Sequence, residues 1–183
     1  MRGNPPETKQ RLLDAATAEF AEFGLGGARV DRIAERSGVN KRMIYAYFGG
    51  KEALFDTVLS YSQEQLIATI QLDTADLPGY AGKLFDYLVE HPERRRLSLW
   101  RSLEAPTAST DVERSATSSK VRELRDADSG KGIDADSLLV FIMGIVSAWP
   151  NATTASTAAA GTDRAAQRAD VVEAVRRLTT PTP

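Results

Sequence analysis

Apolar residues recur every three or four positions along most of this chain, which is the spacing that places side chains on one face of a helix. The first apolar stripe runs from Thr8 to Phe23, and Gly24 follows it as a helix stop. Beyond residue 72 there is no sustained alternation of apolar and polar residues of the kind that indicates a β-strand. The sequence therefore predicts an all-α fold of about nine helices. The other helices are expected over residues 30–37, 41–48, 51 to about 70, 78–90, 93–104, 110–127, 135–149 and 163–179.

The segment from Ile33 to Phe48 has the residue pattern of a helix-turn-helix. Ala34 is small where two helices must approach closely, and Gly38 can adopt the left-handed conformation that a tight turn needs. Val39 and Ile44 can fill the space between the two helices. Because a tight crossing restricts several linked positions at once, the pattern predicts a helix-turn-helix domain over residues 1–50. The helix that begins at Lys51 is expected to link it to a second helical domain, residues 51–183.

The second helix of a helix-turn-helix lies in the major groove of DNA, with its N-terminal residues facing the base edges. Asn40 is a suitable N-cap for this helix. Arg42 can donate two hydrogen bonds to one guanine, and Ala46 can contact a thymine methyl group. The residues expected to contact bases are Lys41, Arg42, Tyr45 and Ala46.

Three further residues are expected to contact phosphates and to fix orientation without reading sequence: Arg29, Tyr47 and Lys51. Other roles remain open for some of these side chains. Tyr45 and Tyr47 can be partly buried core aromatics, and Lys51 can simply occupy the exposed first turn of the next helix.

The charge distribution is uneven. The net charge is −2, yet residues 29–51 carry six basic residues and only two acidic ones. A basic tip on an acidic body orients one end of a protein toward a polyanion. Without the helix-turn-helix, a solvated surface of mixed charge would explain the same composition.

Composition argues against several other classes of protein. The chain has no cysteine and one histidine, His91, which is expected in a turn before Pro92. No nucleophile, base and orienting group are spaced as in an enzyme, so we expect no catalytic site, metal or cofactor. The N-terminal residues lack the apolar core of a secretory signal, and no apolar run reaches about twenty residues. We therefore expect a cytoplasmic protein without a membrane partner.

Residues 8–58 resemble the N-terminal domain of the TetR (tetracycline-repressor-like) family of transcriptional regulators. The resemblance is carried by Thr8-Lys9, Leu12-Leu13-Asp14-Ala15-Ala16, Phe20, Gly24, Ile33-Ala34, Gly38-Val39, Ile44-Tyr45-Ala46-Tyr47-Phe48 and Lys51-Glu52-Ala53-Leu54-Phe55. It implies a homodimer that binds a double-stranded DNA operator, and a C-terminal domain that holds a small-molecule effector and the dimer interface. The sequence departs from the family pattern in two respects. Arg42 and Met43 replace a small residue, and Arg29 replaces a Ser or Thr cap, so the helix after Arg29 is expected to be less well capped.

Residues 135–149 are apolar on nearly all sides, so a helix there must be covered on several faces. By the resemblance, this helix and the last one would form the dimer interface, although a monomeric core is the competing interpretation. The expected interface residues are Leu138, Ile142, Ile145, Val172 and Val175.

Aromatic residues in the C-terminal part are candidates for the wall of an effector pocket, since such pockets are mostly apolar. The candidates are Phe85, Trp100, Phe141 and Trp149, with core packing as the alternative for each. Arg94-Arg95-Arg96 is expected to be a solvated helix face that could relay pocket changes to the helix from Lys51. Residues 151–161, rich in Ala and Thr, are expected to be a flexible link.

Together these features predict a ligand-responsive transcriptional regulator, a repressor of a pseudo-palindromic operator that a small molecule releases. An enzyme and a helical partner-binding module that has lost DNA binding are the alternative functions. The cluster of basic residues over 29–51 argues against the second alternative.

Overall fold

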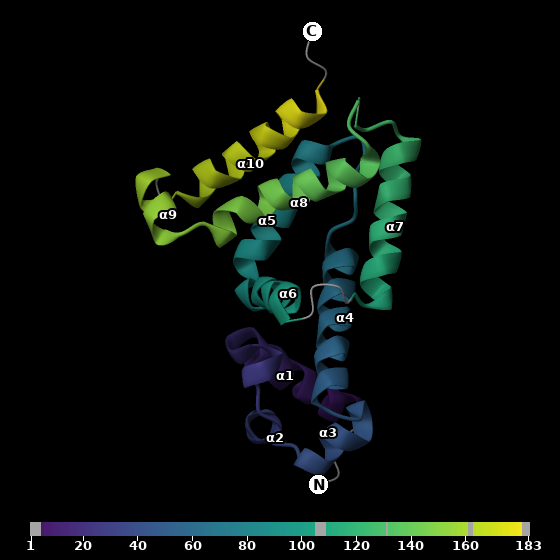
Figure 1. The fold of residues 1–183 in the computed structure, drawn as a ribbon, viewed down its shortest axis with the longest axis vertical. Coiled ribbons are helices and arrows are strands. Elements are labelled where there is room, and N and C mark those ends of the chain that lie inside the picture. Colours follow the sequence, from purple (N-terminus) through teal and green to yellow (C-terminus); the bar gives the residue numbers. More distant parts are fainter. Residues whose placement is uncertain (1–4, 105–108, 131, 161–162, 181–183) are drawn as a thin grey trace. The chain divides into compact units, whose positions relative to one another are not determined.

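The computed structural model describes residues 5–104, 109–130, 132–160 and 163–180 (Figure 1). Within these residues the chain forms ten α-helices and no strand, which confirms the all-α class. The helices are α1 (Pro5–Gly27), α2 (Val30–Ser37), α3 (Lys41–Phe48), α4 (Lys51–Thr69), α5 (Leu77–Glu90), α6 (Pro92–Glu104), α7 (Asp111–Asp126), α8 (Ala135–Asn151), α9 (Thr154–Ala160) and α10 (Arg164–Thr179). None of the described helices is both long enough and apolar enough to cross a membrane.

The expected flexible link at residues 151–161 is wrong for most of its length. Asn151 is the last residue of α8, and Thr154–Ala160 forms α9. The Thr153 hydroxyl accepts a hydrogen bond of 3.3 Å from the backbone N–H of Ser156, as an N-cap does. The alanines that follow have the highest helix propensity of any residue. The composition of residues 151–161 suggested a linker, but composition does not show that Thr153 can cap a helix. Gly161 lies outside the described residues.

The described residues fall into two compact units. Unit 1 contains residues up to 65 together with residues 91–113. It therefore holds α1, α2, α3, most of α4, and α6. Unit 2 contains residues 66–90 and those from 114 onward, including α5, most of α7, α8, α9 and α10. Unit 1 is thus not one continuous segment, because α6 packs against α1.

Unit 1 has its own apolar core. The side chains of Leu12, Ile33 and Ile44 are fully buried, and they come from α1, α2 and α3. Phe20 of α1 meets Phe55 of α4 edge to face, with their ring centroids 4.9 Å apart. The helix-turn-helix is therefore held on α1 and α4 by burial of the apolar stripes that the sequence displays.

Unit 2 has a second core between α5, α7, α8 and α10. Its fully buried side chains include Tyr80, Leu84 and Phe85, Leu124, Leu138, Ile142 and Val146, and Val175. Helices α5 and α10 approach closely at Gly82, where an added Cβ would lie 2.8 Å from an Arg168 guanidinium nitrogen. Arg168 pairs with Asp86 of α5 at 2.7 Å. Close packing and this ion pair together fix α10 on α5.

Candidate nucleic-acid interface

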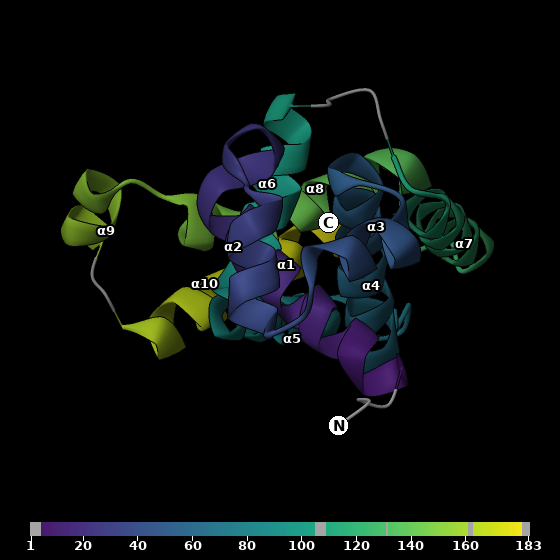
Figure 2. The same cartoon turned by 90° about the horizontal axis from the view of Figure 1, so that it is seen from below.

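The turn between α2 and α3 has the geometry that the sequence predicts (Figure 2). Gly38 adopts the left-handed conformation, with φ 64° and ψ 26°. Its backbone N–H donates to the Glu35 carbonyl at 3.2 Å, and the N–H of Val39 donates to the Ala34 carbonyl at 3.1 Å. This pair of hydrogen bonds is a Schellman motif, which ends a helix and satisfies its last carbonyl groups. Val39 is buried, so the turn is also anchored in the core of unit 1.

Both ends of α3 are fixed by local hydrogen bonds. The Asn40 side-chain oxygen accepts from the Arg42 backbone N–H at 2.9 Å, which confirms the predicted N-cap. At the other end Gly49 has φ 87°, and its N–H donates to the Tyr45 carbonyl at 2.9 Å. These caps define a helix of eight residues.

The two faces of α3 differ sharply in burial. Ile44 is fully buried in the core of unit 1, and Met43 and Phe48 are half-buried. Tyr45 is 49% exposed and Tyr47 is 37% exposed. The side chains on the exposed face are Lys41, Arg42, Tyr45, Ala46 and Tyr47. This face contains all four residues predicted to contact bases.

The basic side chains around α3 differ in how they are already engaged. Lys41 lies 2.8 Å from the carboxylate of Asp31 on α2, and the hydrogen bond that its ammonium donates to this carboxylate raises the pKa of Lys41. The Lys51 ammonium donates to the Ala28 carbonyl at 3.3 Å, so part of its hydrogen-bonding capacity is used. Within the described part of the chain, the exposed guanidinium groups of Arg29 and Arg42 form no ion pair. These two cations are free to meet an external anion.

A buried carboxylate supports the start of α2, and sequence reasoning missed it. Glu19 of α1 is 1% exposed and accepts from the Arg29 backbone N–H at 2.9 Å and from Arg32 Nε at 2.8 Å. Burial raises the pKa of Glu19, but the hydrogen bonds from Arg32 and Arg29 and the nearby positive charge outweigh it, so the pKa lies below its usual value. The helix has no side-chain cap at Arg29, as expected. Glu19, on α1, instead accepts the hydrogen bond from the backbone N–H at the start of α2. The signal in the sequence was a carboxylate within the apolar stripe of α1, between Ala16 and Phe20.

Helix α6 is joined to α1 at a break in α1. Gly24 has φ 67° and ψ −177°, a conformation essentially restricted to glycine. The Trp100 indole N–H donates to the Ala21 carbonyl at 3.2 Å, and a Cβ on Gly24 would lie 2.7 Å from the Trp100 ring. The Glu104 carboxylate accepts from the backbone N–H groups of Leu25 and Gly26, at 2.7 and 3.0 Å. Trp100, a predicted pocket residue, thus packs on α1 inside unit 1.

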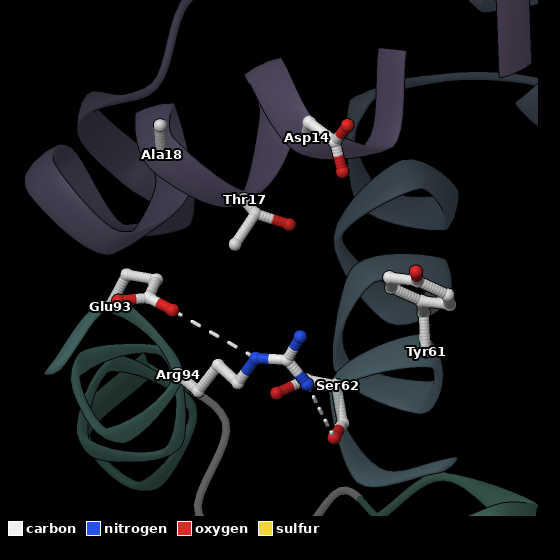
Figure 3. Close-up of a pocket in the computed structure, with 7 residues that line it drawn as sticks. All are labelled: Asp14, Thr17, Ala18, Tyr61, Ser62, Glu93 and Arg94. Atoms are coloured by element: carbon white, nitrogen blue, oxygen red, sulfur yellow. Dashed lines mark hydrogen bonds and ion pairs between the residues drawn. The ribbon is translucent and has the colours of Figure 1, made fainter. Parts of the chain in front are cut away.

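Unit 1 also contains a cavity of about 250 Å³ lined by α1, α4 and α6 (Figure 3). Arg94 extends into it from α6, and its guanidinium donates to the Ser62 carbonyl of α4 at 3.5 Å. Asp14 and Thr17 line the cavity from α1. Arg94 and Arg95 are half-buried, so the predicted solvated face is correct only for Arg96. The predicted relay to the helix from Lys51 stays a prediction, although Arg94 does contact that helix.

Two family models match the chain. The model described as "Tetracyclin repressor-like, C-terminal domain" matches residues 76–177, more than half of the sequence. The chain belongs to the TetR family. A second model, "Bacterial regulatory proteins, tetR family", matches residues 12–58 and so spans the helix-turn-helix. The chain is therefore a DNA-binding transcriptional regulator of the TetR family.

Individual TetR-type relatives agree with this assignment. The chain is 37% identical over 153 residues to the HTH-type transcriptional repressor SCO4008 of Streptomyces coelicolor, which covers 80% of this chain and 79% of that protein. It is 40% identical over 93 residues to the HTH-type transcriptional repressor NicS of Pseudomonas putida, covering 47% and 44% of the two chains. The crystal structure of the transcriptional regulator SCO4942 from Streptomyces coelicolor superposes with a TM-score of 0.83 at 38% identity, covering 93% and 97%.

In this TetR-family chain the expected dimer residues are only partly available to a partner. Leu138, Ile142 and Val175 are 0% exposed because they fill the core of unit 2, so their assignment to an interface surface is corrected. Ile145 and Val172 are half-buried. The apolar side chains that α8 exposes are instead Val140, 67% exposed, and Phe141, 49% exposed. The sequence predicted the helical period of α8. It did not show which face of α8 packs against other helices of the same chain.

The remaining aromatic pocket candidates do not share one environment. Phe85 is fully buried in the core of unit 2, which favours core packing over the wall of a pocket for this residue. Trp149 is half-buried at the edge of the same core, and Phe141 is exposed on α8. Among the residues with described placement, no group of three or more His, Cys, Asp or Glu side chains is arranged to hold a metal ion.

Proposed function

We propose that this TetR-family chain is a homodimeric repressor that binds a pseudo-palindromic operator and is released by a small-molecule effector. The exposed face of α3 is the observation that carries the proposal, because it offers Arg42, Tyr45 and Ala46 beside one another on a helix that is capped at both ends. Two relatives are named transcriptional repressors, which supports repression as the outcome of binding.

The proposed contacts to DNA follow from exposure and charge. Arg42 would donate to guanine, Ala46 would meet a thymine methyl group, and Tyr45 would contact a neighbouring base edge. Lys41 would reach the bases only by leaving Asp31, because the two side chains are paired in the free protein. The proposed phosphate contacts are Arg29, Tyr47 and Lys51.

Dimerisation is proposed through the exposed apolar face of α8. Val140 and Phe141 are exposed there, and Gly144 has open space around it that allows another helix to approach. Two copies would then present their α3 helices to successive major grooves about 34–36 Å apart. Half-sites of that spacing, related by a two-fold axis, make a pseudo-palindrome.

Effector binding is proposed in unit 2, which contains most of the segment that matches the family's C-terminal model. The effector would favour a conformation whose two α3 helices are wrongly spaced for the operator. The effector can shift the equilibrium between the two conformations only by as much as its affinities for them differ. By linkage, bound DNA must lower the affinity for the effector by the same factor as the effector lowers the affinity for DNA.

The proposal is tested with the DNA upstream of the gene for this chain. Fluorescence anisotropy is measured for labelled fragments over a series of salt concentrations, with no effector present. We expect a sequence-selective complex whose affinity falls steeply with salt, because counterions are released from the phosphates. Binding that is equally weak for all fragments would contradict the proposal and favour a helical module that has lost DNA binding.

A further inference from the structure

The cavity of about 250 Å³ in unit 1 lies between α1, α4 and α6, and all of its lining residues belong to that unit (Figure 3). Charged side chains and side chains with hydroxyl groups line it: Asp14, Glu93 and Arg94, and Thr17, Tyr61 and Ser62. The volume lies just below the range of about 300–1,000 Å³ that is usual for drug-sized ligands. The cavity therefore suits a small molecule with charged groups.

Asp14, on α1, brings a carboxylate to the cavity that has no cationic partner. Its Oδ1 accepts a hydrogen bond of 2.8 Å from the side-chain amide of Gln10, which is neutral. Within the described residues the carboxylate forms no ion pair, and Oδ2 accepts no hydrogen bond. An ionised carboxylate has about four acceptor positions on its two oxygens. Asp14 can therefore accept hydrogen bonds from a ligand that carries an ammonium group.

Arg94, on α6, brings a positive charge to the same cavity, and its side chain is only 21% exposed. Its Nε lies 3.8 Å from the Glu93 carboxylate, and its guanidinium donates to the Ser62 carbonyl at 3.5 Å. Both contacts are long, since charge-assisted hydrogen bonds to a carboxylate usually measure about 2.7–2.9 Å. The planar guanidinium matches the geometry of a carboxylate, with two parallel N–H donors. A carboxylate that enters the cavity can therefore bind Arg94 more closely than these two contacts do.

The two charged groups enter one space from different helices. In Figure 3 the Asp14 carboxylate points into the cavity from α1, and a guanidinium nitrogen of Arg94 points into it from α6. The two groups do not form an ion pair with each other, because Asp14 pairs with no described cation. A molecule can therefore lie between a negative and a positive group. It would satisfy both by placing an ammonium at Asp14 and a carboxylate at Arg94.

We infer that the cavity between α1, α4 and α6 binds a small zwitterion, whose ammonium group pairs with Asp14 and whose carboxylate pairs with Arg94. An anion without an ammonium group would leave Asp14 unpaired and would be repelled by Asp14 and Glu93. A cation without a carboxylate would be repelled by Arg94. The site belongs to unit 1, whereas the effector is proposed to bind in unit 2. The inference therefore does not depend on the proposed function.

The test is a titration of the full chain without DNA, followed by the amide signals in NMR spectra. The probes are glycine, β-alanine and γ-aminobutyrate, which separate the two charges by increasing lengths of carbon chain, with butylamine and butanoate as single-charge comparisons. We expect at least one zwitterion to bind about tenfold or more tightly than either comparison, because it forms charge-assisted hydrogen bonds at both ends. The signals of Thr17 and Ser62 should shift with it.

Three results of this titration would overturn the inference. Butylamine or butanoate that binds as tightly as every zwitterion would show that one charge is sufficient. Shifts confined to residues of unit 2 would place the binding site elsewhere. Absence of binding by every zwitterion up to about 20 mM would remove the site. None of these results bears on operator binding, which is measured without these probes.

Asp14→Asn tests the ammonium end, because it removes the charge and keeps the size of the side chain. It should weaken binding of the tightest zwitterion at least about tenfold, whereas butanoate should bind no more weakly than to the parent. Glu22→Gln is the matched control, because Glu22 is exposed on the same helix, is absent from the lining and loses the same charge. It should leave zwitterion binding unchanged. Equal effects of the two variants would show only general electrostatic attraction and would contradict the assignment.

Arg94→Gln tests the carboxylate end. It should weaken binding of the zwitterion and of butanoate, and butylamine should bind no more weakly than to the parent. Arg96→Gln is the control, because Arg96 is exposed on the same helix and is absent from the lining. Arg94 also contacts α4, so the amide spectrum without probe must first show that the variant is folded. If it is not, Arg94→Lys keeps the charge but loses the bidentate geometry, and it should weaken zwitterion binding by a smaller factor. Zwitterion binding that is unchanged in the folded variant would overturn the role of Arg94.

Discussion

The Arg32 guanidinium lies 2.6 Å from the Glu19 carboxylate, and this ion pair joins α2 to α1. Glu19 is almost completely buried, whereas Arg32 is partly exposed. Replacing Glu19 by Ala would leave the Arg29 backbone N–H without its present acceptor and leave Arg32 without its charge partner. We expect the free energy of unfolding to fall by about 1–3 kcal/mol, as measured by urea denaturation. Glu22→Ala is the control, since Glu22 is exposed and its carboxylate is 3.9 Å from Arg36; it should change stability by less than about 0.5 kcal/mol.

The same carboxylate should make stability depend on pH. Its pKa is lower in the folded protein than the ordinary value of 4.5, so the stabilisation is complete above that value and is lost as the pH falls through the folded pKa. Denaturation curves between pH 3 and pH 7, taken for the parent and for Glu19→Gln, measure this effect. The loss of stability below pH 4.5 should be smaller in the variant. Parallel curves for the two proteins would show that Glu19 is not the group responsible.

Arg42→Ala should relax sequence specificity. Because Arg42 is exposed and forms no ion pair with a described residue, its removal should leave the unfolding midpoint unchanged. We expect the discrimination at one base step of the operator to fall by about 1–3 kcal/mol, measured by anisotropy with substituted operators. Arg42→Lys, which keeps the charge but loses the bidentate geometry, should recover affinity without recovering discrimination. A variant that still distinguishes every substituted operator as the parent does would show that Arg42 does not read a base.

Asp31→Asn should strengthen DNA binding, because Asp31 pairs with Lys41 and hydrogen-bonds to it in the free protein. Freed Lys41 can release one more counterion, so the slope of log affinity against log salt should steepen by about one. Glu35→Gln changes the net charge equally on the same helix but does not touch this pair, and it should have the smaller effect. If the two variants behave alike, Lys41 makes no contact with DNA.

Gly24→Ala should destabilise unit 1. The substitution forces a backbone conformation that only glycine adopts easily, at a cost of about 1–3 kcal/mol, and the new methyl group would lie 2.7 Å from the Trp100 ring. Thermal unfolding and tryptophan fluorescence, to which Trp100 contributes, report the change. Gly50→Ala is the control, because Gly50 has ordinary backbone geometry and an added Cβ would lie 3.8 Å from the Glu52 carboxylate. Equal stability of the two variants would contradict this interpretation of Gly24.

Phe141→Glu should weaken the proposed dimer. A carboxylate on the exposed face of α8 would have to be buried without a partner when two chains meet there. Sedimentation velocity should show a dissociation constant raised at least about tenfold. Ser118→Glu adds the same charge to an exposed position of α7 and should leave the dimer intact. A dimer that tolerates Phe141→Glu would assemble through a different surface.

Local features of the fold could be predicted from the sequence because single residues determine them. Gly38 and Asn40 set the turn and the start of α3, and each needs only its neighbours to act. The apolar stripe of α1 was equally readable, since helical periodicity is a property of one segment.

Features that depend on contacts between distant segments could not be predicted in the same way. The contact of Glu104 with Leu25 and Gly26 joins residues almost eighty positions apart. Likewise, the periodicity of α8 showed that it is apolar on several sides, but burial of Leu138 and exposure of Phe141 depend on where α5 and α10 pack. Periodicity identifies an apolar face but not the helix that covers it.

The place of α6 limits how this protein can be divided. The chain passes between the two units at residues 65, 90 and 113. The unit that contains the helix-turn-helix is therefore completed by α6, which follows α5 in the sequence. A fragment that ends after α4 would lack Leu97, Trp100 and Glu104, and α1 would expose the apolar surface that they cover. Fusing the first fifty residues to another regulator would therefore transfer α3 without the helix that packs against α1. A chimaera designed to exchange operator specificity between such proteins would also need α6.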